Sequence, residues 1–582
     1  MLAMIVTGVI IIAVIIGVSV ALVSKSLSPD TKVVVNNNSV LVIDLDKRLH
    51  EQSEVNPLAI LSDEDPYSAG LYHSLDAIAE AKDDDNIKGI LIKIKSGNNG
   101  FATLQQLRDA IVDFRSSGKF VYAYGEMITQ GAYYVATAAD SIYLNPVGDM
   151  ELKGFATVLA FFKGTLQKLE VEPEIFYAGK FKSATEPFRA DKISEPNREQ
   201  IEAFQKGFWT EFLQAVAAHT KSDTATINQL AATGAIQFPN DALQHKLVDG
   251  LLYWDEVEAK LKEKTDRKED EKVKYITLDE YAETTRNTQR GNDRIAVIFA
   301  EGNIVDGKSE DVYEIASETL TKSIRAAKNN KKVKAVVLRV NSPGGSALAS
   351  DVILRELQLL QKKKPLVISM GDLAASGGYY ISCQADSVFA LPTTITGSIG
   401  VFSVLFNAEN MMKNKLGITF DEVKNTPYAD FPTVVRPLTA DENQKMQNSV
   451  NHIYETFKSR VATGRKLDVA YVDSIAQGRV WTGADAYKLG LVDGLGGLDR
   501  AISSASALAK TDDYKIVTYP EPIDRFEMMM KRFKGASISE AAVKAMLEDN
   551  MGSDYTYFKE IKRLRDINGR SLMAMPFKMS IQ

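Results

Sequence analysis

The sequence is poor in cysteine and histidine, two residues on which many catalytic and metal sites are built. Its 582 residues include one cysteine, Cys383, so the chain can form neither an internal disulfide nor a cysteine cluster for a metal. The net charge of −7 at pH 7 leaves no excess of basic residues for wrapping nucleic acid. We therefore expect no metal and no nucleic-acid partner, and no feature of the sequence requires a cofactor.

Histidine is scarce as well, and none of the histidines lies in a recognisable catalytic motif. The chain has five histidines, His50, His73, His219, His245 and His452. The G-x-S-x-G sequence that carries the serine of many hydrolases is also missing, because Ala374 occupies its first glycine position. A serine hydrolase built on this chain would need a base other than histidine.

Charge is absent from the first 23 residues, MLAMIVTGVIIIAVIIGVSVALV. At about 1.5 Å per residue, a helix of this length spans roughly the 30 Å of a bilayer core. The basic segment that opens a secretory signal is missing. The sequence therefore predicts a retained transmembrane anchor over residues 1–24 and a polar stalk over 25–38, and it gives no clear signal for membrane orientation.

The rest of the chain alternates short apolar runs with helix-like stretches, which indicates α/β domains. Sliding the chain by 246 residues places GAYYVATAADSIYLNP on GGYYISCQADSVFALP, with identity at seven of sixteen positions. This long period indicates a tandem duplication of a whole domain, since solenoid repeats are only about 20 to 50 residues long. We predict one half over residues 39–254, a charged connection over 255–293, a second half over 294–519 and a tail over 520–582.

The two halves differ at positions that matter chemically. Under the shift of 246 residues, Ser376 aligns with Gln130, and Gly344 and Gly345 align with Asn98 and Asn99. In the other direction, Lys182 of the first half aligns with Tyr428. Each half has lost what the other keeps, which predicts one active site that draws on both halves.

Ser376 is the candidate nucleophile, although a serine in an AASGG turn is more often a packing residue. It follows the apolar run PLVISM and precedes a helix-like segment, and backbone N–H groups are free at such a strand-to-helix turn. We expect the N–H of Gly377 and one from Gly344 or Gly345 to form an oxyanion hole.

Lys182 is the candidate base, against the simpler reading of a solvated surface charge. Burial would have to lower its pKa from about 10.4 toward 7, and Phe181, Ser183 and Phe188 are nearby residues that could provide the surroundings. Ser398 differs from its counterpart Leu152, and its hydroxyl could bond the neutral lysine.

Several motifs together resemble the long form of bacterial signal peptide peptidase A, also called protease IV. They are RVNSPGGS, MGDLAASGGYYIS, TGSIGVF, GKFKSATEPF and GRVWTGADAYKLGLVDGLGG. The resemblance covers nearly the whole chain and implies tandem duplicated crotonase/Clp-protease-like α/β domains behind an N-terminal transmembrane helix. The tail after Tyr519 matches nothing in the family pattern.

The resemblance also implies a serine endopeptidase with a Ser376/Lys182 dyad assisted by Ser398. It implies a homotetramer on the outer side of the cytoplasmic membrane, with remnant signal peptides as substrates. Two alternatives remain open at this point: an inactive membrane-anchored scaffold, and a crotonase-type acyl-CoA enzyme that uses the glycine loops without a serine nucleophile.

Overall fold

The computed structural model describes residues 33–56, 67–94, 99–285, 291–309, 311, 313–520, 523–524 and 571–574. The predicted anchor over residues 1–24 and most of the tail lie outside these ranges. Among the helices within them, none has the length and apolar character needed to cross a bilayer.

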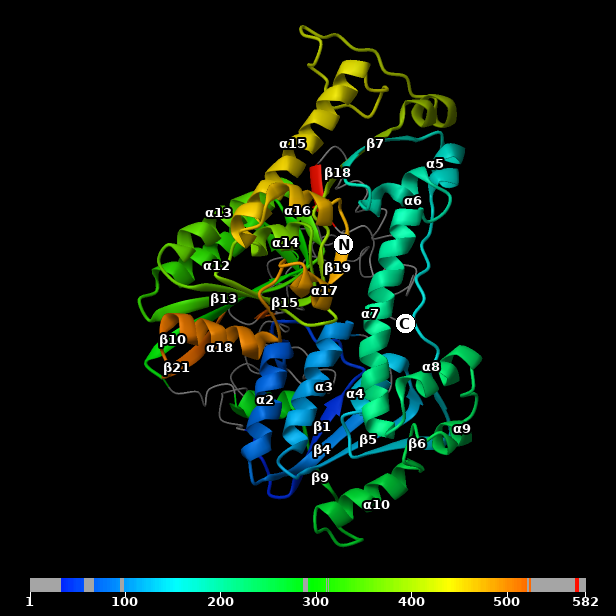
Figure 1. The fold of residues 1–582 in the computed structure, drawn as a ribbon, viewed down its shortest axis with the longest axis vertical. Coiled ribbons are helices and arrows are strands. Elements are labelled where there is room, and N and C mark those ends of the chain that lie inside the picture. Colours follow the sequence, from blue (N-terminus) through cyan, green and yellow to red (C-terminus); the bar gives the residue numbers. More distant parts are fainter. Residues whose placement is uncertain are drawn as a thin grey trace, which may run out of the picture.

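The first half is built on a six-stranded parallel sheet with helices packed against it (Figure 1). Its central strand IKGILIKI is rich in isoleucine and has buried residues on both faces, as expected for a strand covered on two sides. In spatial order the strands are β8 (Gly250–Leu251), β6 (Ser141–Met150), β5 (Phe120–Ile128), β4 (Ile87–Ile94), β1 (Ser39–Asp44) and β9 (Lys274–Thr277).

The second half repeats this sheet with the same strand order. Its parallel core consists of β20 (Gly494–Leu495), β16 (Ser387–Ala390), β15 (Leu366–Ala375), β13 (Val333–Ser342), β10 (Asp293–Glu301) and β21 (Tyr514–Tyr519). Two further strands widen the sheet at the carboxyl end of β15. Strand β17 (Ile395–Gly397) pairs with β15, and β19 (Val480–Thr482) pairs with β17.

Matching side-chain contacts relate the two halves. The hydroxyl of Tyr133 donates to the carbonyl of Leu247 at 2.7 Å, and that of Tyr379 donates to Leu491 at 2.8 Å. Both tyrosines lie in the duplicated GAYY and GGYY segments. The second tyrosine of each repeat is buried too, so these residues serve the packing of both copies.

The charged stretch over residues 255–293 is more than a linker. It forms most of helix α10 (Trp254–Lys264), then β9 and α11 (Leu278–Thr285). Strand β9 pairs with β1 at the edge of the first sheet, in the place that β21 takes beside β10 in the second. The stretch therefore completes the first half, although its composition resembles that of a solvated connection.

The helices surround these sheets (Figure 1). Those of the first half, besides α10 and α11, are α2 (Leu71–Asp83), α3 (Phe101–Arg115), α4 (Gln130–Ala136), α5 (Lys163–Leu169), α6 (Glu186–Arg189), α7 (Glu195–Thr220), α8 (Thr224–Thr233) and α9 (Pro239–Gln244), with a short 3₁₀ turn at Ser183–Thr185. Those of the second half are α12 (Ser317–Asn329), α13 (Ala347–Gln361), α14 (Gly377–Ser382), α15 (Ala440–Arg465), α16 (Val469–Ile475), α17 (Gly483–Lys488) and α18 (Leu498–Ala509), with a π-helical turn at Met411–Lys415.

Helix α7 and a third sheet join the halves. Phe204 and Phe208 of α7 pack against Ala375 and Val480 of the second half, while Phe212 belongs to the core of the first. The third sheet has the order β12 (Glu314–Ala316), β11 (Asn303–Val305), β14 (Gly344–Ser346), β23 (Ser571–Ala574), β18 (Val401–Asn407) and β7 (Glu172–Ala178). Only β7 comes from the first half. A smaller sheet contains β22 (Ile523–Asp524), β2 (Glu54–Val55) and β3 (Tyr67–Ser68).

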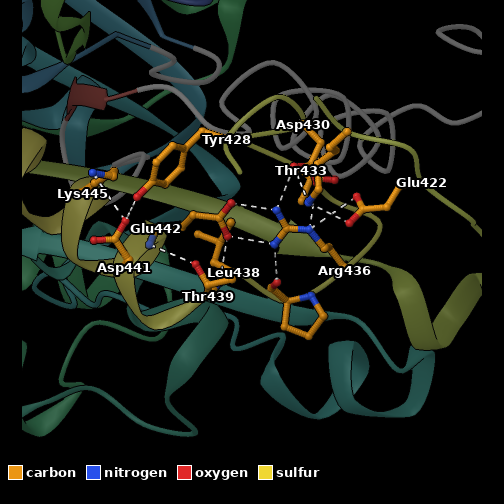
Figure 2. Close-up of polar contacts among 12 residues, drawn as sticks. Glu422, Tyr428, Asp430, Thr433, Arg436, Leu438, Thr439, Asp441, Glu442 and Lys445 are labelled. Carbon is orange, nitrogen blue, oxygen red and sulfur yellow. Dashed lines mark hydrogen bonds and ion pairs between the residues drawn. The ribbon is translucent and has the colours of Figure 1, made fainter. Parts of the chain in front are cut away.

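An arm over residues 408–438 projects from the second half between β18 and α15, at the top of Figure 1. The end of the arm next to α15 is fixed by Arg436, which donates to both carboxylate oxygens of Asp430 and of Glu442 at 2.7 to 3.0 Å (Figure 2). Glu442 also accepts from the N–H of Thr439 and closes the capping box of α15. The guanidinium of Arg436 lowers the pKa of Glu442 to about 2, so the contact persists as an ion pair at neutral pH.

A buried ion pair connects a loop of the first half to the central strands of the second. Arg339 on β13 donates to both carboxylate oxygens of Glu51, at 2.8 and 3.2 Å, and the two side chains are 0% and 2% exposed. Arg339 also donates to the hydroxyl of Ser369 and the carbonyl of Met370. Glu51 also accepts from the side-chain amide of Asn341 near the end of β13, the strand that precedes the candidate glycines.

Replacing Glu51 by glutamine should destabilise the protein by about 3 to 5 kcal/mol, because the Arg339 charge would remain buried without a counter-charge. A Glu51→Leu/Arg339→Leu double variant should lose less than the single variant. Urea unfolding of the full chain, followed by tryptophan fluorescence, measures both. Lys163→Gln, which removes the exposed pair with Asp191, is the control and should cost at most about 1 kcal/mol. An unchanged unfolding midpoint for Glu51→Gln would contradict this account.

Candidate active site

Ser376 lies in the sharp turn between β15 and α14. Its backbone has φ 56° and ψ −113°, a conformation that non-glycine residues adopt rarely and at a cost of about 1 to 3 kcal/mol. The turn is held because Ser376 N–H donates to the carbonyl of Gly397 at 2.8 Å. The counterpart Gln130 is the first residue of a regular helix and is not among the residues with positive φ, so this conformation belongs to the serine-bearing copy.

Lys182 of the first half meets Ser376 of the second. The pairing of β7 with β18 brings the end of β7 to this site, and Lys182 follows four residues after Ala178. Its Nζ lies 2.8 Å from the Oγ of Ser376. The whole Lys182 side chain is 1% exposed and Ser376 is 0% exposed.

Burial also sets the electrostatics of this lysine. Removal from water lowers its pKa well below the ordinary value for a lysine, since an apolar environment disfavours the charged ammonium form. The side chain therefore favours the neutral amine, the form that can accept a proton.

Ser398 is the third polar group at this point. Lys182 Nζ lies 3.1 Å from Ser398 Oγ and 3.2 Å from Ser398 O. Ser398 has a positive φ of 51°, and its N–H donates to the carbonyl of Arg479 at 2.7 Å. The turn between β17 and β18 is thereby fixed with both oxygens of Ser398 directed at the lysine.

The loop before β19 supports Lys182, and sequence reasoning missed this role. A Cβ built on Gly478 would lie 2.7 Å from both the Cβ and the N of Lys182, so only glycine leaves room for the lysine there. The N–H of Phe181 donates to the carbonyl of Gln477 at 2.8 Å. Gly478 opens the GRVWTG motif, which was informative only as part of the family resemblance.

The three residues expected around the lysine have different surroundings. Phe181 is buried beside it, whereas Phe188 packs edge-to-face against Phe406 of β18. Ser183 donates to Asn197 of α7 and accepts from Gln200. The polar network around Ser183 thus holds the segment that carries Lys182 against α7.

The candidate oxyanion glycines also converge. A Cβ built on Gly344 would lie 2.6 Å from the N of Gly377, and Gly344 has φ 97°, so two backbones approach closely at a position that suits only glycine. The N–H of Gly344 donates to Ser342 Oγ at 3.1 Å. Gly345 is itself paired with Ile304 of β11 and Met573 of β23, so the candidate donors remain Gly377 and one of Gly344 and Gly345.

Three of the five histidines have partners elsewhere. His50 bonds Glu301, His73 bonds Ser53 and His219 lies 3.6 Å from Asp249. Within the described part of the chain, the side-chain partner of Ser376 Oγ is Lys182.

Comparisons with known proteins agree with the duplicated architecture. The model of peptidase family S49 matches residues 113–268 and again residues 358–512, and the Clp protease model matches residues 286–396. The chain thus has two α/β domains of the S49 and Clp-protease kind.

Whole-chain relatives cover both halves. The chain is 38% identical to "Protease 4" of Salmonella typhi over 82% of its own length and 78% of the relative's. It is 34% identical to "Protease 4" of Haemophilus influenzae, over 83% and 80% of the two chains. "Serine protease SPPA, chloroplastic" of Arabidopsis thaliana is 33% identical over 75% of this chain and 65% of that one. The chain therefore belongs to peptidase family S49, as a serine peptidase of the signal peptide peptidase type.

Proposed function

We propose that the chain hydrolyses peptide bonds with a Ser376/Lys182 dyad assembled from its two halves. The observation that carries this proposal is the buried Lys182 Nζ 2.8 Å from Ser376 Oγ. In this scheme the half over residues 39–254 supplies the lysine and the half over 294–519 supplies the serine. Ser376 Oγ attacks the carbonyl carbon of the substrate, and its proton passes to Lys182.

A neutral Lys182 amine can satisfy the hydrogen bonds around it. Such an amine has two N–H groups and one lone pair. The carbonyl and hydroxyl oxygens of Ser398 accept the two N–H groups, which leaves the lone pair for the Ser376 hydroxyl. Ser398 thereby acts as a positioning residue, because it orients the lone pair toward the nucleophile.

The rest of the cycle follows from the same groups. The N–H groups of Gly377 and of either Gly344 or Gly345 stabilise the oxyanion of the tetrahedral intermediate. Protonated Lys182 then gives its proton to the departing amine, and water hydrolyses the acyl-enzyme with Lys182 again accepting a proton.

We further propose that the substrates are remnant signal peptides and that residues 1–24 hold the enzyme at the cytoplasmic membrane, with its catalytic region on the outer side. The uncharged run over residues 1–23 supports the anchor, and a signal peptide is dominated by an apolar stretch that such an anchored enzyme would meet in the membrane.

Ser376→Ala and Lys182→Met should each lower kcat/KM for an apolar fluorogenic peptide by at least about 10³-fold, because loss of one residue of a catalytic unit removes most of the activity of the whole unit. Thermal unfolding checks that the variants stay folded. Lys180→Met, at an exposed lysine two residues away, is the matched control and should remain active. A serine-directed acylating reagent should label Ser376 in the wild type, a result that an acyl-CoA enzyme or an inactive scaffold would not give. Normal turnover by either dyad variant would refute the assignment.

The pH profile should report the lowered pKa of Lys182. The amine must be neutral to act as a base, so kcat/KM should rise with pH as the amine loses its proton, and fall as pH drops below the pKa of Lys182. Because burial lowers that pKa, the rise should be complete well below the ordinary lysine range of about 10.4. Initial rates measured from acid to alkaline pH test this, and a rate that still climbs through the ordinary lysine range would contradict it.

We also propose the homotetramer that the resemblance implies, with the arm over residues 408–438 as part of its contact surface. The arm exposes the apolar side chains Leu416, Ile418, Phe420 and Val423. Val423→Glu should therefore reduce the mass measured by light scattering in detergent. The control Val469→Glu makes the same substitution at an exposed valine on α16 and should leave that mass unchanged. A monomeric wild type, or a Val423→Glu variant of unchanged mass, would remove the support for this surface.

A further inference from the structure

One turn of the second half holds two segments that meet at the Lys182 amine. It runs from Gln477 to Arg479, between α16 and β19. The carbonyl of Gln477 accepts from the N–H of Phe181, the residue before the lysine, at 2.8 Å. The carbonyl of Arg479 accepts from the N–H of Ser398 at 2.7 Å. A displacement of this turn would therefore move both the lysine and the oxygens that orient it.

The turn has an unfavourable backbone and little room. Gln477 has a positive φ of 51°, a conformation that non-glycine residues adopt rarely. A Cβ built on Gly179 would lie 2.4 Å from the backbone carbon of Gln477, and one built on Gly478 would lie 2.7 Å from the N of Lys182. Such a backbone persists only where its neighbours hold it in place.

Tyr454 of α15 is the side chain that holds the strained residue. Its hydroxyl oxygen accepts from the N–H of Gln477 at 3.1 Å, and its O–H donates to Asp473 Oδ1 of α16 at 3.4 Å. The ring is buried in the core of the second half. Burial raises the pKa of the Tyr454 phenol to about 12, so the hydroxyl stays protonated at neutral and moderately alkaline pH.

An ion pair between α15 and α16 fixes the partner of this hydroxyl. Lys458, one helical turn after Tyr454, is buried and donates to Asp473 Oδ1 at 2.7 Å. The side-chain amide of Gln477 donates to the same oxygen at 3.2 Å. A single carboxylate oxygen thus connects the lysine, the tyrosine and the strained residue, and α16 lies against α15 in Figure 1.

The first half lacks the acceptor at the equivalent position. Helices α7 and α15 both have 26 residues, and matching them from their first residues places Trp209 at the position of Tyr454. The counterpart of Lys458 is Leu213. Trp209 donates its indole N–H to Asn228 at 2.7 Å, and an indole has no oxygen that could accept a backbone N–H. The acceptor is therefore present only in the half that supplies the proposed nucleophile.

We propose that Tyr454 is a positioning residue for the base: its hydroxyl holds the Gln477–Arg479 turn, and the turn keeps Lys182 beside Ser376 and out of water. This rests on the proposed Ser376/Lys182 function, in which the amine must be neutral. Without the hydroxyl, the N–H of Gln477 loses its acceptor, the turn relaxes and water gains access to the amine. A more hydrated amine has a higher pKa, so less of the enzyme holds the neutral form at a given pH.

Tyr454→Phe tests this role by removing one oxygen atom. At neutral pH, kcat for an apolar fluorogenic peptide should fall at least about fivefold, the effect of one buried hydrogen bond. KM should change less than about twofold, because Tyr454 acts through the lysine and not on the peptide. The rise of kcat/KM with pH should move to higher pH, since a base with a higher pKa becomes neutral only in more alkaline solution. An unchanged kcat with an unchanged pH profile would overturn the proposal.

Tyr133→Phe is the matched control. It removes the hydroxyl of another buried tyrosine, one that bonds the carbonyl of Leu247 in the first half. Its cost in stability should be comparable, which thermal unfolding of both variants measures, but its pH profile should stay that of the wild type. An equal shift of the profile in both variants would show a general loosening of the fold and would overturn the proposal.

The surroundings of the base can also be measured without activity. In the full chain labelled with ¹³C at the lysine Cε, the NMR signal of Lys182 should titrate at higher pH in Tyr454→Phe than in the wild type, and at the wild-type pH in Tyr133→Phe. The same titration in all three proteins would overturn the proposal. If Ser376→Ala keeps normal turnover, the proposed function fails, whereas this titration still decides whether Tyr454 positions the lysine.

Discussion

The structure depends on the burial of one amine, that of Lys182, beside one hydroxyl, that of Ser376. Neither half can arrange this alone. The lysine follows β7 of the first half, the serine follows β15 of the second, and the pairing of β7 with β18 joins them. The burial that lowers the pKa of Lys182 is produced by this union, so the neutral amine is favoured only when both halves are folded together.

The duplication explains how such a site is possible. Both halves retain the parallel sheet and the buried tyrosines, which stabilise each copy. The first copy keeps Gln130 where the second has Ser376, and Gln130 uses its side chain to bind the loop at Lys153 and Gly154. The first half thus contributes a lysine to the site, whereas the second half has the strained turn and the glycine loop. The buried Glu51–Arg339 pair fixes their relative placement.

Much of this could be read from the sequence, and the reasons are physical. Strong apolar β-branched runs such as β4 and β13 predict buried parallel strands, and the comparison of the two copies singled out Ser376 and Lys182. Long-range pairings carry no such local signal. Nothing in the sequence near β7 indicates that it pairs with β18, nothing marks Gly478 as the support of Lys182, and the charged composition of residues 255–293 conceals β9. The four residues of β23 are too few to show a period, which is why the tail could not be interpreted before its place beside the glycine loop was known.

The central claim is that Lys182 is a neutral amine in the resting enzyme. It can be tested directly by NMR titration of the full chain labelled with ¹³C at the lysine Cε, with Lys182→Met used to assign the signal. The account predicts one lysine signal that titrates well below the ordinary lysine range of about 10.4 and that is missing from the variant. A Lys182 signal that titrates within the ordinary range would show a charged ammonium group beside Ser376 and would contradict the proposed dyad.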